Sequence, residues 1–311
     1  MKDHDQRFKS LLQTFLPEFF QLFFPDWAAR FDFTHAEFLN QEAFLDPPKG
    51  ERRQLDVVAK LPTTQPDPHA HGDAPKPWLA LIHVEIEHPD SIAAFRPRFL
   101  EYYETLRLRH HLPVLPVALF LQVGLNGIGH DVHEERFWDL PVLRFEYLYV
   151  GLPALLAEEY VAGDNALGLA LSALMRLAPE RRAVLAAEAL QRIRELPNDA
   201  ARQYLLGEVV LAYGATTAEQ RQELDEVLKS DRYREARIMQ RTVLDDVRDE
   251  GRLEGQREGC RKSVRVVLEL RFGKLSRQIE EQLAGFSESE LSDLLSRAVT
   301  APSLQDLGLE D

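Results

Sequence analysis

The spacing of hydrophobic residues in the first half of the chain predicts a helix followed by strands with one helix among them. Large apolar residues recur three and four positions apart from Phe8 to Phe23, which predicts one helical face that Pro17 kinks or restarts. A further helix is predicted at 100–111, beginning near Ile92. Apolar or alternating runs predict strands at 31–39, 54–61, 78–88, 114–123 and 142–150. Strands separated by a helix favour an α/β sheet with at least one crossover.

A long turn is predicted between the strands at 54–61 and 78–88. It is marked by a run of prolines, Pro62, Pro66, Pro68, Pro75 and Pro77. After this first half the composition changes, because 15 of the 18 prolines lie at or before Pro153 and the remainder is rich in Ala, Leu, Glu and Arg. That composition predicts a helical second half.

The longest helical stretch predicted in the second half contains regularly spaced glycines. Gly251, Gly255 and Gly259 recur every fourth residue within 234–265, which contains no proline. This spacing places them on one helical face and favours either a long solvated helix that pairs with another molecule or a simple spacer helix. Intervening charges exclude a membrane setting for the same spacing.

Short amphipathic helices are predicted near the end of the chain, at 264–272, 279–283 and 291–297. Ser287 and Glu290 have the spacing of a capping box ahead of the last of them. Together with the change near residue 155, these patterns predict four segments. They are 1–155, 156–232, 233–262 and 263–311.

Composition limits what the chain can be. At 311 residues it is long enough for about two domains, and 45% hydrophobic residues can form a core. One cysteine excludes an intramolecular disulfide framework. The first ten residues lack an apolar signal segment, and the longest uncharged stretch, 112–129, is interrupted by prolines, so we expect a cytoplasmic protein without a membrane span. The net charge of −14 disfavours purely electrostatic binding to nucleic acid.

Three acidic residues interrupt apolar strands. Side chains of a strand alternate between faces, so Glu85 and Glu87 point the same way, and Asp56 interrupts the preceding strand in the same manner. Carboxylates there are costly unless paired, hydrogen-bonded or bound to metal. If the strands are neighbours, the three converge as ligands for a hard divalent ion such as Mg²⁺ or Mn²⁺, which can activate water at a phosphoryl group. The alternative is a solvated face for the two glutamates, with Asp56 capping a turn.

This arrangement resembles the PD-(D/E)XK nuclease superfamily, and more closely its Rpn/YhgA-like transposase branch, over roughly residues 8–150. The resemblance rests on Asp56, the proline-rich connection, the segment His83 to His88, and a following helix. It implies a restriction-endonuclease-like mixed sheet flanked by helices, in which Asp56 and Glu85 hold the metal. Glu87 stands where most members have Lys and the Rpn-like branch has Gln, which leaves its role open as a ligand or a base.

Other residues of this half are weaker candidates. Arg98 and Tyr102 match a pair that follows the motif in Rpn-like proteins, with a supporting or phosphate-binding role. Glu18 matches the helix acid that many of these nucleases add to the metal site, although an acid in a first turn also favours the helix dipole. Lys60 is a doubtful replacement for the missing lysine, because four strand residues span about 13 Å. The histidines near the motif, His69, His71, His83 and His88, are expected to pack or to be solvated.

The end of the chain resembles the small DUF4351 domain that is often attached to Rpn-like proteins. The shared features are L-x-x-R-F-G at 268–273, a following helix, and a terminal Ser-Leu-x-x-Leu at 303–307. This association strengthens the family resemblance, and it assigns no chemistry to these residues. The sequence therefore predicts an α/β nuclease-like domain followed by an all-helical extension.

The function that these patterns favour is a Mg²⁺-dependent DNA endonuclease of the recombination-promoting type. Because the overall charge repels DNA, contact with the duplex would use a local patch around Arg98, Arg107 and Arg109. The basic residues at 107–111 are equally explained by the end of a helix. The alternative function is a catalytically silent nuclease fold that acts as an interaction or assembly module, with homo-oligomers formed through the C-terminal helices.

Overall fold

A computed structural model of the chain describes residues 2–39, 44–46, 51–53, 57–66, 77–87, 92–197, 199–273, 275–298 and 300–309. The chain divides into two units, Met1–Gln240 and Arg241–Asp311. The boundaries predicted near residues 155 and 232 both fall within the first unit. Among the described residues, no helix combines the length and apolar character that crossing a bilayer requires.

The apolar N-terminal segment forms two consecutive helices, α1 (Lys2–Thr14) and α2 (Leu16–Phe23). The chain breaks at Phe15, and Pro17 lies in the first turn of α2, where its missing N–H costs nothing. The predicted restart at Pro17 is thus confirmed. The predicted apolar face is buried, including Phe8, Leu11, Leu12, Phe15, Leu16, Phe19 and Phe20. A short helix, α3 (Pro25–Ala28), follows.

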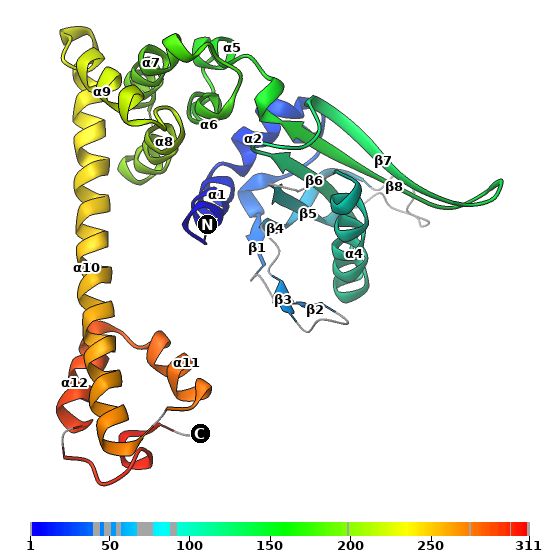
Figure 1. Cartoon of the computed structure of the whole chain (residues 1–311). Helices are drawn as coiled ribbons and strands as arrows, with labels where there is room; N and C mark the ends of the chain where they lie inside the picture. Colours follow the sequence, from blue (N-terminus) through cyan, green and yellow to red (C-terminus); the bar gives the residue numbers. More distant parts are fainter. Residues whose placement is uncertain are drawn as a thin grey trace. The chain divides into compact units, whose positions relative to one another are not determined.

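A six-stranded mixed sheet forms the centre of the first unit, in the order β1-β4-β5-β6-β8-β7 (Figure 1). Its strands are β1 (Glu37–Phe38), β4 (Val57–Pro66), β5 (Pro77–Glu87), β6 (Val114–Phe120), β7 (Gly127–Phe137) and β8 (Leu140–Gly151). Strand β6 is parallel to both β5 and β8, and the remaining neighbours are antiparallel. Helix α4 (Ile92–His110) is the predicted crossover between β5 and β6. Two short strands, β2 (Phe44–Asp46) and β3 (Glu51–Arg53), pair separately.

Both faces of the sheet are covered. On one face Val58, Ala118 and Phe120 form a core with an aromatic row of α4 that includes Phe95 and Phe99. Residues that alternate with these along β4 and β5 are also buried, among them Val57, Ala59, Ile82 and Val84. Helix α1 contacts β4, so the sheet lies between helices, as the hydrophobic runs of these strands require.

The predicted proline turn is wrong in part. Pro62 and Pro66 lie within β4 and Pro77 begins β5, so the two strands are longer than predicted. The pairing shifts register between Pro62 and Pro66, and such an irregularity accommodates residues that cannot donate to the ladder. The strand predicted at 31–39 is also mostly wrong, because Asp32 accepts a hydrogen bond from the Thr34 N–H and starts a 3₁₀ turn, η1 (Phe33–His35).

Strand β7 was not predicted. Its sequence from Gly127 to Phe137 lacks an apolar alternation, and its residues are half-buried or exposed. Its position comes from antiparallel pairing with β8, which runs from Gly127↔Gly151 to Phe137↔Leu140. Gly151 at the end of β8 is required by close packing, because a Cβ there would lie 1.7 Å from the Leu125 carbonyl oxygen.

Every named element after Gly151 is helical, which confirms the helical second half. The α-helices are α5 (Ala157–Ala162), α6 (Ala166–Leu171), α7 (Arg182–Glu195), α8 (Ala200–Tyr213) and α9 (Ala218–Val227). Short 3₁₀ turns join them: η2 (Leu152–Ala154), η3 (Ser172–Leu174), η4 (Pro179–Arg181) and η5 (Asp231–Tyr233). Side chains of Asn165, Asp199 and Thr217 cap α6, α8 and α9. Helix α8 contacts α1 and helix α6 contacts α2, so this layer packs on the N-terminal helices.

The second unit has its own core. Helix α10 (Arg234–Phe272) begins in the first unit and continues through 264–272, where a separate short helix was predicted. Helices α11 (Arg277–Gly285) and α12 (Glu288–Ala298) and the turn η6 (Gln305–Leu307) complete the unit. Their apolar faces enclose a core that includes Val264, Leu268, Ile279, Leu283, Leu291, Leu294 and Leu307.

The R-F-G sequence that ends α10 has a structural role. Arg271 donates a hydrogen bond of 2.6 Å to the Ala298 carbonyl at the end of α12. Gly273 adopts φ +87°, a left-handed conformation that ends the helix at low cost for glycine. The predicted capping box is also present, because the Ser287 N–H donates to the Glu290 carboxylate over 2.7 Å.

Candidate functional site

The two strands that carry the predicted carboxylates are hydrogen-bonded neighbours. Strands β4 and β5 pair antiparallel, from Val57↔Val84 to Pro62↔Leu79. Asp56 lies outside the described residues. Glu85 and Glu87 occupy the last positions of β5, and their side chains lie outside what the structure describes. The adjacency on which the predicted metal site depends is therefore present in the backbone.

Buried aliphatic residues fix the backbone of β5 around these positions. Ile82 and Val84 are fully buried and Ile86 is nearly so, which confirms the predicted apolar face of this strand. Glu85 is in register with Ala118 of β6, and Glu87 with Phe120. Both register partners belong to the core beneath α4. The candidate positions thus lie in the middle of the sheet, next to the strand end from which the chain continues to α4.

Glu18 has a partner that the sequence did not indicate. It lies in the first turn of α2, and its carboxylate accepts a hydrogen bond from the Arg202 guanidinium of α8. Arg202 also donates to the Thr14 carbonyl over 3.1 Å, and its guanidinium lies 4.0 Å from the centre of the Phe15 ring. This ion pair connects α8 to the junction of α1 and α2. Local sequence patterns could not predict this pair, because its two residues are 184 positions apart in the chain.

Arg98 and Tyr102 lie one turn apart on α4, as predicted. Tyr102 is only 8% exposed and belongs to the core between α4 and the sheet. The Arg98 guanidinium lies 5.8 Å from the centre of the Phe95 ring. Arg107 and Arg109 are exposed in the last turn of the helix, a position at which cations also stabilise the helix dipole.

The remaining sequence candidates are placed only in part. Lys60, which is half-buried, forms an ion pair of 3.3 Å with Glu37 of β1. The side chains of the histidines at 69, 71, 83 and 88 lie outside the described residues. Within the part of the chain that is described, no three His, Cys, Asp or Glu side chains gather as a metal site. The three predicted carboxylates are outside that search.

A polar cluster that the sequence did not predict joins β7 and β8 to α4. Arg96 makes two hydrogen bonds to Asp131, of 2.8 and 2.9 Å, and the Tyr147 hydroxyl donates to the same carboxylate over 2.5 Å. Burial alone would raise the pKa of Asp131, but the hydrogen bonds from Arg96 and Tyr147 bring that pKa below its ordinary value. Burial and the bond to Asp131 raise the pKa of Tyr147. The cluster therefore holds a charged carboxylate at the base of the β7–β8 hairpin.

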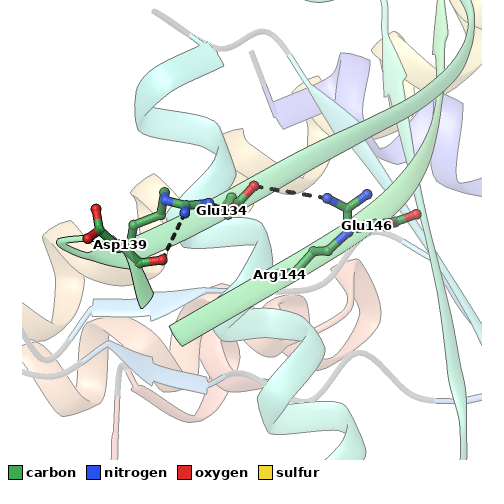
Figure 2. Close-up of polar contacts among 5 residues, drawn as sticks. Glu134, Asp139, Arg144 and Glu146 are labelled. Atoms are coloured by element: carbon green, nitrogen blue, oxygen red, sulfur yellow. Dashed lines mark hydrogen bonds and ion pairs between the residues drawn. The ribbon is translucent and has the colours of Figure 1, made fainter. Parts of the chain in front are cut away.

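The far end of the same hairpin is different in character. Phe137, Trp138, Leu140 and Val142 are between 55% and 86% exposed, with Trp138 the most exposed of them. Trp138 also has φ +55°, a conformation that costs a non-glycine residue about 1–2 kcal/mol. Figure 2 shows Glu134, Asp139, Arg144 and Glu146, which lie along the hairpin from its turn toward the sheet. Glu134 bridges Arg136 at 2.6 Å and Arg144 at 4.0 Å, and Arg144 also binds Glu146 at 2.6 Å.

No protein-family model matches the chain, and no curated protein or solved structure is significantly similar to it.

Proposed function

We propose that this protein is a metal-dependent endonuclease that hydrolyses phosphodiester bonds of DNA, with Asp56, Glu85 and Glu87 at its centre. The observation that carries the proposal is the antiparallel pair Val57↔Val84. Asp56 is bonded to Val57 and Glu85 to Val84, and consecutive Cα atoms are about 3.8 Å apart. Chain connectivity alone therefore keeps these two acids near one another.

The chemistry of this donor set fits a hard divalent cation. Asp56 and Glu85 would hold Mg²⁺ or Mn²⁺, and Glu87 would either bind it or orient the attacking water. The ion would supply an activated water and neutralise charge on the phosphoryl group. The buried residues Val57, Val84 and Ile86 hold the backbone of the two strands from which these carboxylates would bind the ion.

The architecture supports the proposal at a coarser level. A mixed sheet between helices, with α4 connecting two parallel strands, is the arrangement that the resemblance to restriction-endonuclease-like proteins implies. Arg107 and Arg109 at the exposed end of α4 supply positive charge for a phosphate backbone. Because the whole chain carries −14, binding through so small a patch is expected to weaken strongly with salt.

The direct test is nicking of supercoiled plasmid with and without Mg²⁺ or Mn²⁺. Replacement of a metal-holding carboxylate, Asp56→Asn or Glu85→Gln, is expected to lower the rate by at least about 100-fold, since even residues behind metal ligands are worth about 10–100-fold. Glu37→Gln is the matched control, because Glu37 is an exposed carboxylate of the same sheet, paired with Lys60. We expect it to cleave within about twofold of the wild type.

Equal cleavage by the wild type and both carboxylate variants would overturn the proposal. A wild type that cleaves DNA with neither Mg²⁺ nor Mn²⁺ would overturn it as well. Single-stranded RNA run in parallel reports whether the substrate is RNA instead. If the wild type cleaves RNA but not DNA and the same variants lose that activity, the proposed catalytic residues stand and the substrate is RNA.

The second candidate function is a catalytically silent fold that acts as an assembly module. Two observations favour it: Glu18 is engaged by Arg202, and Glu87 stands where a lysine or glutamine is expected. A silent fold has no need for a cation, so direct measurement of metal binding separates the two functions.

A further inference from the structure

Strand β7 is the last strand of the central sheet and has an open outer edge. The strand order ends in β6-β8-β7, and within the described residues no strand pairs with the side of β7 that faces away from β8. All 11 residues of β7, from Gly127 to Phe137, are half-buried or exposed. The β7–β8 hairpin also extends beyond its neighbours, because β8 pairs with β6 only from Leu148 to Gly151 (Figure 1). A long row of unpaired N–H and C=O groups is a site for pairing with another strand.

The tip of the hairpin is unfavourable for an isolated molecule. Trp138 is 86% exposed and occupies, with φ +55°, the first position of a two-residue turn in which glycine is the usual residue. Phe137 lies beside it at 5.0 Å between ring centres and is itself 65% exposed. A strained position combined with large exposed apolar residues is typical of a surface that contacts another molecule.

The charges of the hairpin limit the kinds of partner. Within 127–151 the carboxylates outnumber the guanidinium groups, so the hairpin does not attract DNA or an anionic lipid surface. Strand β7 itself carries histidines and acids in close succession, His130, Asp131, His133 and Glu134. A strand that holds both kinds of group is able to face a copy of itself without repulsion, provided that the register brings unlike groups together.

The symmetry of such a self-pairing restricts its register. A two-fold axis normal to the sheet keeps each face of the sheet on its own side, so only residues of the same face lie opposite each other. The axis must therefore pass through a residue and not between two residues. Complete overlap of β7 with itself, from Gly127 to Phe137, places Val132 on this axis.

From these observations we propose that β7 binds β7 of a second copy of this chain, edge to edge, in an antiparallel pairing centred on Val132. This register places His133 opposite Asp131 of the other copy and His130 opposite Glu134. Because β7 is the edge strand of each sheet, the second copy adds on the side away from β8 and β6. The surface lies apart from the candidate metal site, and the proposal does not depend on the nuclease function.

Registers shifted by one residue are less favourable. Centring the pair on Asp131 places this carboxylate opposite itself, and centring it on His133 places Asp131 opposite Glu135. Like charges directly opposite each other destabilise a strand pair. In the proposed register Glu135 lies opposite Gly129, and no residue of β7 faces a charge of its own sign.

The same register gives the tip of each hairpin a place on the other copy. Phe137 lies opposite Gly127, where an added Cβ would meet no described atom within 4 Å, so there is room for the ring. Gly129 is the next residue on this face, and a Cβ there would lie 3.1 Å from the Tyr149 hydroxyl, so the Tyr149 side chain lies beside the glycine. Aromatic residues that pack over glycines of a neighbouring strand stabilise such pairs. Phe137 of each copy thus leaves water between a glycine and an aromatic ring.

The first test is the mass of the full chain in solution, measured by sedimentation over a range of concentrations. We expect a dimer for the wild type and at least a tenfold weaker dimer for Phe137→Ala, which removes the ring opposite Gly127. Leu108→Ala is the matched control, because it removes an apolar side chain that is 74% exposed on α4. We expect this control to leave the dimer unchanged.

A wild type that remains monomeric at about 100 μM would overturn the proposal, because this concentration is far above the dissociation constants of specific dimers. A dimer that Phe137→Ala does not weaken would overturn it as well, and would place the interface elsewhere, for example on the C-terminal helices.

The second test examines the register with two single variants. His130→Glu places carboxylates opposite each other on both sides of the axis, and Glu134→His places histidines there. We expect His130→Glu to weaken its own dimer about tenfold, because two like-charged pairs form. His111→Glu makes the same charge change at an exposed position after α4 and is expected to leave the dimer unchanged.

Mixing the two variants provides the decisive comparison. In a mixed dimer every carboxylate at 130 or 134 again faces a histidine, so the mixed dimer should be tighter than the dimer of His130→Glu alone. Fluorescent labelling of one variant measures this directly. Mixed association no stronger than self-association of His130→Glu would contradict the proposed register.

Discussion

Two parts of the central sheet, the β4–β5 pair and the β7–β8 hairpin, depart from the usual distribution of polar and apolar residues in opposite ways. In the β4–β5 pair, backbone pairing and buried aliphatic residues fix the strands, and the sequence places acidic residues among apolar ones. The β7–β8 hairpin carries mixed charge, extends beyond the sheet and exposes aromatic residues at its tip. The first part thus has acidic residues in apolar strands, and the second has large apolar residues in contact with solvent. Such violations are expected at functional sites, and here they separate candidate chemistry from candidate association.

The contrast continues within the hairpin itself. Its base is fixed to α4 by the hydrogen-bonded group of Arg96, Asp131 and Tyr147 and by the packing of Phe145 against Phe99. Its tip has exposed rings, and the Arg136–Glu134 ion pair beside them is a surface pair of the kind that contributes little to stability in water. The hairpin is therefore anchored where it leaves the sheet and accessible where it ends.

The largest expected effect on stability belongs to the core that β4 and the β7–β8 hairpin share. Phe99 is fully buried, with its ring centre 5.0 Å from that of Phe95 and 5.2 Å from that of Tyr147. Phe99→Ala is expected to lower the free energy of unfolding by about 3–5 kcal/mol, because it leaves a cavity under both the sheet and the hairpin. Urea denaturation measures this, with Leu108→Ala expected within about 0.5 kcal/mol of the wild type. Similar losses in the two variants would show that α4 does not form this core.

An intermediate effect is expected at the base of the hairpin. Asp131→Asn removes a charged acceptor from Arg96 and Tyr147 and is expected to cost about 1–3 kcal/mol of stability at pH 7. Because the folded-state pKa of Asp131 is lowered, its contribution is fully present above its unfolded pKa of about 4 and is lost as the pH falls through the folded value. Denaturation at pH 7 and pH 3 should therefore show a smaller difference between the two proteins at the lower pH. A difference that grows in acid would contradict the charged state assigned to Asp131.

The smallest effect on stability is expected at the tip. Trp138→Gly relieves a left-handed backbone conformation, so it should leave the free energy of unfolding unchanged or raise it by up to about 1 kcal/mol. Thermal unfolding at a protein concentration low enough to exclude association measures the effect on the monomer. A clear loss of stability would show that Trp138 supports the fold of the hairpin. It would contradict the view that the base stabilises the hairpin and the tip does not.

Much of the fold could be predicted from hydrophobic spacing. Local patterns predict the restart of the helix at Pro17, the strands that correspond to β4 and β5, the crossover helix and the helical second half. The prediction failed where tertiary contacts override local sequence. Prolines at 62, 66 and 77 are tolerated in strands at an irregular register, and β7 is a strand only because β8 pairs with it.

For the candidate site, the sequence predicts which acidic residues are involved but not the contacts that other polar residues make. The acidic residues inside apolar strands could be read from the sequence, and the adjacency of their strands is now established by pairing. The Glu18–Arg202 ion pair and the Arg96–Asp131–Tyr147 group could not be found in this way, because their members come from helices and strands far apart in the chain. The turn at the tip of the hairpin was not predicted, because the residue with a positive φ is Trp138, and tryptophan is not a residue type that indicates such a turn.

Cation binding tests the central claim most directly, because only the proposed nuclease needs it. Titration calorimetry with Mn²⁺ should show a saturable site in the wild type and in Glu37→Gln, and at least a tenfold weaker site in Asp56→Asn and Glu85→Gln. Loss of binding in the two strand variants with retention in the control would establish these carboxylates as the metal site. Absence of binding to the wild type, or equal binding by all four proteins, would contradict the account.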